Sequence, residues 1–296
     1  MDPRFGPDER HAAQVLIDLA LAEDLRDAGD ITSTALIDAS ARGVVAVVAR
    51  ENGVLSGLPV AEQVMAAVDP DVEFKQLAID GQRIVAGTTV ATLTGRVRSL
   101  LAGERTILNF VTHLSGVATL THTFVDAVSG TRAQILDTRK TLPGWRVLQK
   151  YAVRCGGGVN HRLGLFDAVL IKDNHLAAWS NAPGHPGLAA AIERARQMTG
   201  HGTPIEVEVD TLDQLRDVLP AAPDYVLLDN MTPETLHEAV MIRDQMAPAV
   251  LLEASGGVTL ATVRAIAESG VDRISVGALT HSAPALDVGF DWEADH

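Results

Sequence analysis

The sequence has a single cysteine, Cys155, among 296 residues, few aromatic side chains, and fewer basic than acidic residues. One cysteine cannot form a disulfide within the chain, which suits a reducing compartment. Three Trp, two Tyr and six Phe leave little for base stacking, and 24 Lys and Arg against 38 Asp and Glu give a formal net charge of −14. Because nucleic-acid binding relies on a broad basic surface and on stacking, both shortages argue against a nucleic-acid binder.

Long hydrophobic runs are also missing. No segment approaches the roughly 18 consecutive apolar residues that suggest a membrane span. The opening "MDPRFGPDERHAAQ" is polar and lacks the apolar core of a signal peptide. Hydrophobic content of 47% and charged content of 21% are typical of a globular protein. We therefore expect a soluble, cytoplasmic protein without a membrane partner.

The first 130 residues predict a mixed domain. "HAAQVLIDLALAEDL" has apolar residues at helical spacing, and "GVVAVVARENGVLSG" and "FKQLAIDGQRIVAGTTVATLTG" are β-rich with glycine turns, which indicates a small antiparallel sheet packed with helices. Residues 104–128 read as long helical structure, in which Gly116 can act as a break.

After residue 130 one unit repeats. Six short apolar runs each end in polar residues or glycine: "AQILDTRK", "AVLIKDNH", "IEVEVD", "YVLLDN", "VLLEASGG" and "RISVGA". Helical segments follow several of them. Apolar strands that alternate with helices predict a parallel sheet covered on both faces. Polar strand ends favour a (β/α) barrel, and the count of six leaves an open doubly wound sheet as the alternative.

Two of these helices have clear start signals. Thr232 fits an N-cap and Pro233 the first helical position, with an apolar stripe at Leu236, Ala239 and Val240. Thr259 is expected to cap the other helix, which closes at Gly270. Its inward-facing residues should be Leu260, Val263 and Ile266.

Positive charge is concentrated between residues 138 and 162, which include six Lys or Arg and one His but no Asp or Glu. Either acids elsewhere in the fold or an anionic ligand must balance this charge. At a common sheet edge, the strand ends would bring together cations, acids and two glycine-rich tails able to bind phosphate through backbone N–H groups. The cations are Arg139, Lys140, His161, Arg162 and Lys172; the acids are Glu208 and Asp229; the tails are 255–257 and 276–278.

Taken singly, each of these residues has an ordinary structural explanation. A strand-end Arg or Lys is usually solvated or ion-paired, "SGG" is usually a turn, and a carboxylate can cap a helix. Their convergence on one edge favours a site. A zinc site is set aside because Cys155 is the only thiol and no His pair has metal-site spacing with a third ligand near it. "CGGGVN" lacks the strand-to-helix setting of a dinucleotide fingerprint, and no Walker loop is present.

Residues 136–175, "LDTRKTLPGWRVLQKYAVRCGGGVNHRLGLFDAVLIKDNH", closely resemble the signature of the quinolinate phosphoribosyltransferase family. Further similar stretches include "EDLRDAGDITSTALI", "GERTILNFVTHLSGVATLT", "EVEVDTLDQL", "LLDNMTPE" and "EASGGVTLATVRAIAESGVDRISVGALTHSAPALD". Together they follow the family's order over nearly the whole chain. "SNAPGHPG" at 180–187 departs from the family as a loop insertion.

The resemblance implies an α/β fold of the type II phosphoribosyltransferases. It consists of a seven-stranded α/β barrel, here residues 116–279, and an N-terminal α/β sandwich domain, residues 1–115, joined by the C-terminal tail 280–296. The residue pattern alone misses one of the seven strands. Family members are similar in forming homodimers, or larger assemblies, with shared active sites. In these, an arginine at the position of Arg105 reaches the neighbour's barrel.

The implied activity is that of a glycosyltransferase in NAD biosynthesis, with quinolinate and phosphoribosyl pyrophosphate giving nicotinate mononucleotide, pyrophosphate and CO₂. Lys140 and Lys172 take the catalytic roles, and Mg²⁺ lies at Glu208 and Asp229. The residues implied for quinolinate are Arg105, Arg139, Lys140, His161, Arg162 and Lys172; those for phosphoribosyl pyrophosphate are Glu208, Asp229, Ser255, Gly256, Gly257, Val276, Gly277 and Ala278. Two alternatives remain: a related phosphoribosyltransferase with another anionic substrate, and a non-enzymatic anion-binding barrel.

Overall fold

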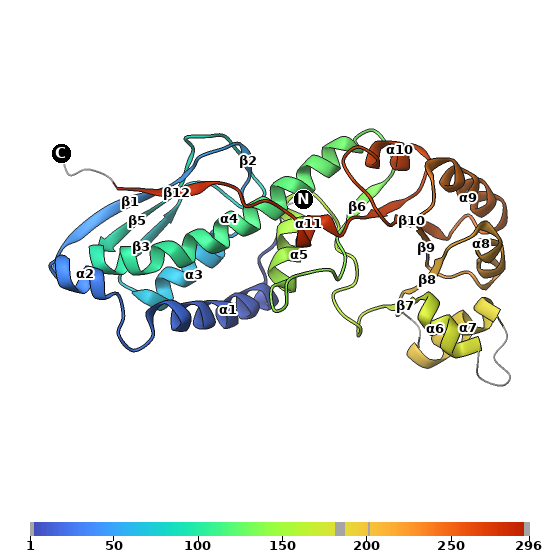
Figure 1. The fold of residues 1–296 in the computed structure, drawn as a ribbon, viewed down its shortest axis with the longest axis horizontal. Coiled ribbons are helices and arrows are strands. Elements are labelled where there is room, and N and C mark those ends of the chain that lie inside the picture. Colours follow the sequence, from blue (N-terminus) through green and yellow to red (C-terminus); the bar gives the residue numbers. More distant parts are fainter. Residues whose placement is uncertain (1–2, 181–186, 201, 293–296) are drawn as a thin grey trace. The chain divides into compact units, whose positions relative to one another are not determined.

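A computed structural model describes residues 3–180, 187–200 and 202–292, and the chain divides into two compact units (Figure 1). Unit 1 consists of residues 1–122, 140–158 and 278–296, and unit 2 of residues 123–139 and 159–277. The domain limits expected from the sequence assign 140–158 to the C-terminal domain, whereas this segment clusters with unit 1.

Unit 1 is built on a four-stranded antiparallel sheet with the order β12-β1-β5-β3. Its long central strands β1 and β5 pair from Arg42↔Arg96 to Val48↔Thr89. On β1, Val45, Val47 and Ala49 are fully buried. β12 comes from the C-terminal tail and adds an edge to this sheet. The strands are β1 (Arg42–Ala49), β3 (Glu73–Gln76), β5 (Thr89–Arg96) and β12 (Val288–Trp292), with a separate pair β2 (Gly53–Val54) and β4 (Arg83–Ile84).

Helices accompany this sheet, as the sequence predicts for the N-terminal part. The capping box of α1, in which Glu9 accepts from the N–H of Gly6, fixes its start just after the polar N-terminus. Asp30 caps α2 by accepting from the N–H of Ser33. The helices are α1 (Pro7–Leu25), α2 (Ile31–Leu36), α3 (Leu58–Val68), α4 (Val97–Ala127, which continues into unit 2), α5 (Arg146–Cys155) and α11 (Ala278–His281).

Helix α4 is continuous through Gly116, so the expected break there is wrong. A Cβ atom at this position would lie 2.0 Å from the carbonyl oxygen of Pro284 and 3.0 Å from the Cα atom of Ala285. Glycine is therefore present because another backbone passes close to the helix, a use of glycine that does not require the helix to stop.

Unit 2 contains six parallel strands in the order β6-β11-β10-β9-β8-β7, so each of the six apolar runs forms a strand as predicted. The strands are β6 (Gln134–Leu136), β7 (Val169–Ile171), β8 (Ile205–Val209), β9 (Tyr225–Asp229), β10 (Leu251–Ser255) and β11 (Arg273–Ser275). An isolated parallel bridge joins Val159 to Leu136, which places a seventh chain segment beside β6. The α/β class is confirmed, and closure of these strands into a barrel stays a prediction.

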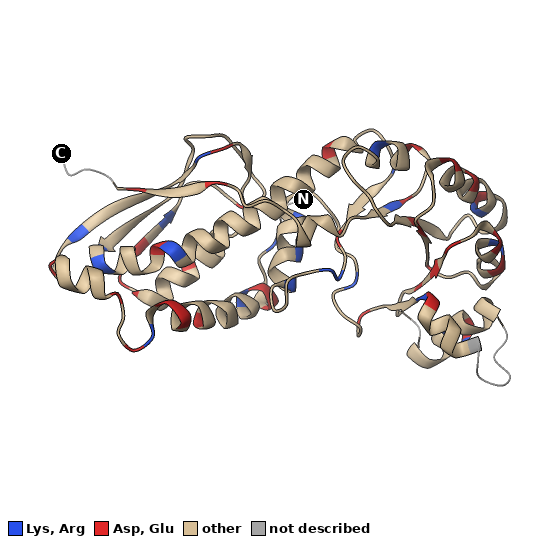
Figure 2. Cartoon of the chain, viewed as in Figure 1, with Lys and Arg blue, Asp and Glu red and all other residues tan. Residues whose placement is uncertain are grey.

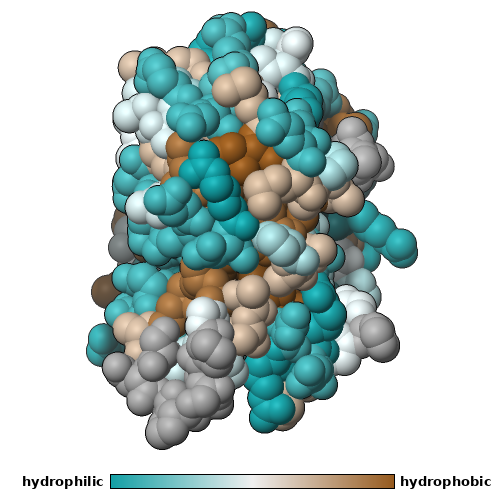
Figure 3. All heavy atoms as spheres, turned by 90° about the vertical axis from the view of Figure 1, so that its right-hand side faces the viewer, coloured by the Kyte–Doolittle hydropathy of each residue, from teal (hydrophilic) through white to brown (hydrophobic). Residues whose placement is uncertain are grey.

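Helices lie along the outside of these strands (Figure 1). They are α6 (Asp173–Ser180), α7 (Gly187–Thr199), α8 (Leu212–Val218) with the 3₁₀ turn η1 (Leu219–Ala221), α9 (Pro233–Met246) and α10 (Val263–Glu268). The face drawn in Figure 3 is largely hydrophilic with separate apolar areas, as expected where helices face solvent. Of the insertion expected at 180–187, residues 181–186 lie outside the described residues.

One predicted helix start is confirmed and the other is wrong. Thr232 caps α9 by accepting from the N–H of Thr235, and Leu236, Ala239 and Val240 are buried. Helix α10, by contrast, begins at Val263 with Thr262 at the N-cap. Thr259 instead forms a turn with Thr262, and Leu260 is 45% exposed rather than inward-facing. The glycine tail 255–257 is thus separated from α10 by a turn.

No helix among the described residues is both long and apolar enough to span a membrane.

The close approach at Gly116 leads to a stability prediction. We expect Gly116→Ala to lower the free energy of unfolding by about 1–3 kcal/mol, because the new methyl group overlaps a backbone carbonyl. Gly103→Ala in the same helix is the matched control, since its Cβ would approach no backbone and would press on the flexible side chain of Met65, with Val68 at ordinary contact distance. Denaturant unfolding of both variants measures the difference, and equal stability of the two would contradict the proposed close contact.

Candidate active site

Several of the site residues expected from the sequence lie at the carboxyl ends of the unit 2 strands. Because all six strands are parallel, these ends meet at one edge of the sheet. Residues two apart along a strand point to the same face. Glu208, Asp229 and Ser255 end or nearly end their strands, Lys172 directly follows β7, and Arg139 and Gly277 lie a few residues beyond β6 and β11.

Lys172 and Glu208 form an ion pair. Strand pairing sets Ile171 opposite Val207, so the next residues along the two strands are neighbours. The Lys172 Nζ atom lies 2.6 Å from Glu208 Oε2, with side chains 44% and 13% exposed. The lysine is thus anchored from the adjacent strand while its charged end keeps access to solvent.

The ends of β9 and β10 form a glycine turn. Asp229 is paired with Ser255, and the N–H of Asn230 donates to the Ser255 carbonyl at 2.9 Å. Gly256 and Gly257 follow with φ values of +97° and +58°, and a Cβ on Gly256 would lie 2.2 Å from Asn230 Oδ1. Only glycine fits this first position.

Within the described part of the chain, the N–H groups of Gly256 and Gly257 donate to no other group, and the space beside Gly257 is open. Consecutive free N–H groups in such a turn can bind an anion. This local geometry fits the phosphate site that the sequence predicts, although a helix terminus does not directly adjoin it.

Arg139 and Arg162 in unit 2 each have a buried Nε atom without a hydrogen-bond partner and form no ion pair among the described residues. Among residues 3–180, 187–200 and 202–292, Arg139 makes no hydrogen bond or ion pair, and its Nε atom is buried. The Nε atom of Arg162 is also buried without a partner, while Nη1 donates to the Ala168 carbonyl at 3.0 Å. Burial and then the charge of Arg139 lower the pKa of Arg162. Both arginines are therefore suited to bind an anion.

One other charge of the 138–162 segment is balanced by an acid within the fold. Arg154 pairs with Glu9 at 2.7 Å, inside unit 1. Lys150 is buried, 2% exposed, in α5. The positive charge of this segment is therefore balanced in two ways. An acid elsewhere in the fold pairs with Arg154, and Arg139 and Arg162 remain available for an anionic ligand.

Arg105 and Lys140 belong to unit 1. Arg105 is exposed on α4 and forms no ion pair with Glu104 or with any other residue in the described ranges. The backbone carbonyl of Lys140 accepts from the Thr280 hydroxyl at 2.8 Å, which ties its segment to α11. Ala278, the last of the predicted phosphate-site residues, is the first residue of α11.

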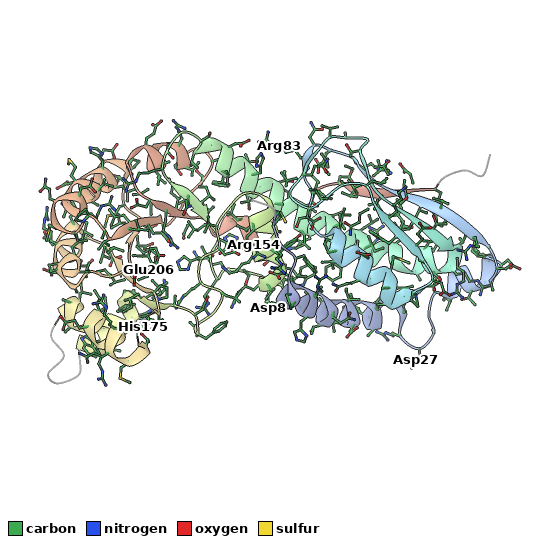
Figure 4. The ribbon with its side chains drawn as sticks, turned by 180° about the vertical axis from the view of Figure 1, so that it is seen from behind. Asp8, Asp27, Arg83, Arg154, His175 and Glu206 are labelled. Atoms are coloured by element: carbon green, nitrogen blue, oxygen red, sulfur yellow. The ribbon has the colours of Figure 1, made fainter. Side chains whose placement is uncertain are left out.

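A buried polar layer lies beneath the site, and sequence analysis missed it. Each of its residues precedes a predicted site residue by two positions. The pairs are Asp137 and Arg139, Glu206 and Glu208, Glu253 and Ser255, and Ser275 and Gly277. All four are at most 4% exposed. Figure 2 shows acidic residues on the strands as well as on the outer helices, and Figure 4 labels Glu206. The period-two alternation of strands was the signal that could have identified this layer.

His161 lies within this layer with both ring nitrogens occupied. Its Nε2 atom lies 3.0 Å from Glu206 Oε2 and 3.3 Å from Glu253 Oε1. The Nδ1 atom accepts the backbone N–H of Arg162 at 2.7 Å. The sequence-based role of His161 in binding quinolinate stays a prediction, and its nearest partners are protein groups.

The surroundings of His161 have opposing effects on its protonation. Burial lowers the pKa of His161, but the hydrogen bonds and charges of Glu206 and Glu253 outweigh it and raise the pKa to about 9. The contact with Arg162 opposes a doubly protonated ring, because a proton on Nδ1 would place two N–H groups face to face at 2.7 Å. This contact favours a ring protonated on Nε2 alone, whereas the two carboxyl groups favour protonation of both nitrogens.

The two carboxyl groups differ in their partners. Burial and the charge of Glu253 raise the pKa of Glu206, whose Oε1 atom is buried without a hydrogen bond. Burial also raises the pKa of Glu253, but His161, Arg273 and Ser275 outweigh it and lower the pKa overall. Arg273 Nε lies 2.7 Å from Glu253 Oε2 and its guanidinium stacks 4.0 Å from the centre of the Tyr225 ring.

His161, Glu206 and Glu253 have ligand atoms within 4.8 Å of one another, close enough for a metal ion. The sequence analysis, which looked for pairs of histidines, did not find this set. Glu253 already binds Arg273 and Ser275, and the proton on His161 Nε2 fills the space between the two carboxyl groups. The arrangement fits a hydrogen-bonded network better than a metal site.

Comparison with known proteins agrees with the fold. Residues 30–115 match the model of the N-terminal domain of quinolinate phosphoribosyl transferase, and residues 117–291 match that of its C-terminal domain. A nicotinate-nucleotide pyrophosphorylase [carboxylating] from Mycobacterium leprae is 48% identical over 285 residues, covering 96% of this chain and 98% of the relative. A quinolinate phosphoribosyltransferase [decarboxylating] 1b from Nicotiana tabacum is 38% identical over 295 residues, covering 95% and 82%.

A solved structure gives the same result. The nicotinate-nucleotide pyrophosphorylase from Francisella tularensis superposes with a TM-score of 0.88 at 40% identity, covering 96% of each chain. Matches to both domain models and to relatives of nearly equal length leave no part of the fold unaccounted for. The chain belongs to the quinolinate phosphoribosyltransferase family.

Proposed function

We propose that this chain transfers the phosphoribosyl group of phosphoribosyl pyrophosphate to quinolinate with loss of CO₂, giving nicotinate mononucleotide and pyrophosphate for NAD biosynthesis. The family relationship supports this reaction. The observation in unit 2 that carries the substrate assignment is the pair of half-buried arginines, Arg139 and Arg162, whose buried Nε atoms have no hydrogen-bond partner and which form no ion pair among the described residues. Quinolinate carries two adjacent carboxylates, which such a pair can bind through forked hydrogen bonds.

The phosphoribosyl half of the site would lie at the ends of β8 to β11. The free N–H groups of Gly256 and Gly257 suit the 5-phosphate, helped by Ser255 and by residues 276–278. The carboxylates of Glu208 and Asp229 suit the ribose hydroxyl groups. Lys172, held at 2.6 Å from Glu208, would be drawn toward the pyrophosphate when the substrate engages Glu208.

Mg²⁺ is the expected cofactor, and the residues present fit it. Glu208 and Asp229 offer the oxygen ligands that this ion prefers, and two carboxylates are what it commonly takes from a protein beside substrate phosphates. When bound, the ion supplies charge neutralisation for the departing pyrophosphate. Glu208 and Asp229 would hold it together with the substrate.

Positioning and electrostatics then carry the transfer. Arg139 and Arg162 orient the pyridine so that its nitrogen faces C1 of the ribose. The nitrogen lone pair forms the new C–N bond as the C–O bond to pyrophosphate breaks and its electron pair leaves with pyrophosphate.

Loss of CO₂ follows from the charge on the ring. After transfer the ring nitrogen is positive and stabilises the electron pair left on the neighbouring carbon when the C–CO₂ bond breaks. That carbon then takes up one proton, for which we propose Lys140 as the donor. Exclusion of water from the site favours decarboxylation, since the departing carboxylate loses its hydration.

A shared dimeric site completes the proposal. Arg105 is exposed on α4 without a partner in the described ranges, which suits a role outside its own chain. We propose that it reaches the quinolinate site of a second copy in a homodimer. The cytoplasm suits this reaction, and the single cysteine, which is free and buried, agrees with a reducing compartment.

The reaction is tested by incubating the protein with labelled quinolinate, phosphoribosyl pyrophosphate and Mg²⁺. We expect one CO₂ for each nicotinate mononucleotide formed, no turnover with chelator, and full recovery when Mg²⁺ is restored. The protein alone should retain no metal after dialysis, because two carboxylates make a weak cage. Transfer to another pyridine without CO₂ release would indicate a related phosphoribosyltransferase, and binding without turnover would indicate a non-enzymatic anion-binding protein.

The guanidinium assignment is tested by Arg139→Lys and Arg162→Lys. Each keeps the charge but loses the forked geometry, and a charged hydrogen bond of ~1.5–3 kcal/mol corresponds to about tenfold or more in affinity. We expect this loss for quinolinate in calorimetric titration. Arg264→Lys is the control, because Arg264 is exposed and pairs with Glu268 one helical turn away. Unchanged quinolinate affinity in both site variants would remove these residues from the carboxylate site.

The shared site is tested by mixing two inactive variants, Arg105→Ala and Lys172→Ala, under conditions that exchange subunits. In a mixed dimer one site would carry both changes and the other neither, so up to about half of the mixed dimer's sites should work. The pair Arg139→Ala and Lys172→Ala is the matched control, since both residues lie in unit 2 of one chain and cannot complement. Activity no higher than in this control, after verified exchange, would show that Arg105 does not act across subunits.

A further inference from the structure

The buried polar layer beneath the site has no part in the proposed reaction. Glu253 and Asp137 are 0% exposed and Glu206 is 4% exposed. Burying carboxyl groups costs several kcal/mol each unless their partners are well placed. Buried groups of this kind beside a strand-end site are candidates for a functional role.

The layer is connected to Arg162 through one side chain. Glu206 and Glu253 converge on His161 Nε2 at 3.0 and 3.3 Å, and His161 Nδ1 accepts the Arg162 backbone N–H at 2.7 Å. Asp137 accepts the backbone N–H of His161 at 3.0 Å. The residue that carries a buried, unpartnered guanidinium nitrogen is thus held by the ring of the residue before it.

The two ring nitrogens depend on each other. A neutral imidazole carries one proton, and the hydrogen bond made by one nitrogen determines which nitrogen has the lone pair. Carboxyl oxygens at Nε2 favour a proton there and leave the Nδ1 lone pair free to accept from Arg162. Without them the proton could move to Nδ1, where it would repel the Arg162 N–H.

We propose that Glu206 and Glu253 are positioning residues that fix His161 as the Nε2-protonated tautomer and thereby hold Arg162 in place for the quinolinate carboxylate. This inference rests on the proposed role of Arg162. It assigns functions to two residues that bind neither substrate, and it makes His161 act through the backbone of its neighbour.

The anchoring of Glu253 explains why two carboxyl groups are present. Arg273 and Ser275 both bind Glu253, so this residue is fixed from below and provides a constant acceptor. Glu206 is the nearer of the two to Nε2 and has an Oε1 atom without a hydrogen bond. Replacing Glu206 therefore disturbs the ring while leaving the Arg273 pair intact.

Two variants of similar size separate a positioning role of Glu206 from a purely structural role. Glu206→Gln keeps a carbonyl oxygen that can accept from Nε2, whereas Glu206→Leu removes the nearer of the two acceptors and leaves only Glu253 at 3.3 Å. We expect Glu206→Leu to raise KM for quinolinate about tenfold, the loss of one hydrogen bond to a charged group, with KM for phosphoribosyl pyrophosphate unchanged within about twofold. Glu206→Gln should stay within about threefold of the parent for both. A purely structural role would instead change both KM values together, and that result would overturn the proposal.

The tautomer is measured without substrate. In protein labelled with ¹⁵N-histidine, the His161 signals are assigned by their loss in His161→Gln. We expect an unprotonated Nδ1 and a protonated Nε2 in the parent and in Glu206→Gln, and a partly protonated Nδ1 in Glu206→Leu. A proton on Nδ1 in the parent would overturn the proposal. Since this measurement needs no turnover, it stands apart from failure of the proposed reaction, which the parent's own CO₂ assay would reveal.

Discussion

The repulsion between the guanidinium groups of Arg139 and Arg162 is the constraint on which the site depends. Both Nε atoms are buried without a partner, and the charge of Arg139 adds to burial in lowering the pKa of Arg162. A protein gains nothing in stability from two such cations placed together. An anion bound between them would offset this charge, and the proposed substrate quinolinate carries two carboxylates on adjacent ring carbons.

Below Arg139 and Arg162 lies the buried polar layer, whose charged groups contact one another. Glu253 is surrounded by His161, Arg273 and Ser275, and Glu206 shares the same imidazole. Glu206 and Glu253 precede the predicted site residues Glu208 and Ser255 by two positions on β8 and β10, and residues two apart share a face. The buried polar layer can therefore hold the site residues above it in place. Arg139 and Arg162 can then remain unpaired without a change of conformation.

Local signals predicted local structure well, and errors arose where a distant segment intervened. Thr232 and Pro233 start α9 as expected, since a cap and its helix are adjacent in sequence. Gly116 does not break α4, because its small size serves the backbone at Pro284, far along the chain. Helix α10 begins after Thr262, whose side chain makes no cap hydrogen bond, so the presence of a threonine at 259 did not by itself fix the helix start.

The sequence by itself determined that unit 2 has six strands, that these strands are parallel and alternate with helices, and which residue types follow their carboxyl ends. These features follow from periodicity along one strand at a time. Only the tertiary structure decided which charges remain unpaired. Arg154 finds Glu9, and Lys172 finds Glu208, while Arg139 finds no acid among the described residues. His161 contacts two buried carboxyl groups and a backbone N–H, and these contacts also depend on the tertiary structure. Pairing of charges depends on register between strands and on chain segments far apart in sequence, and no single segment contains that information.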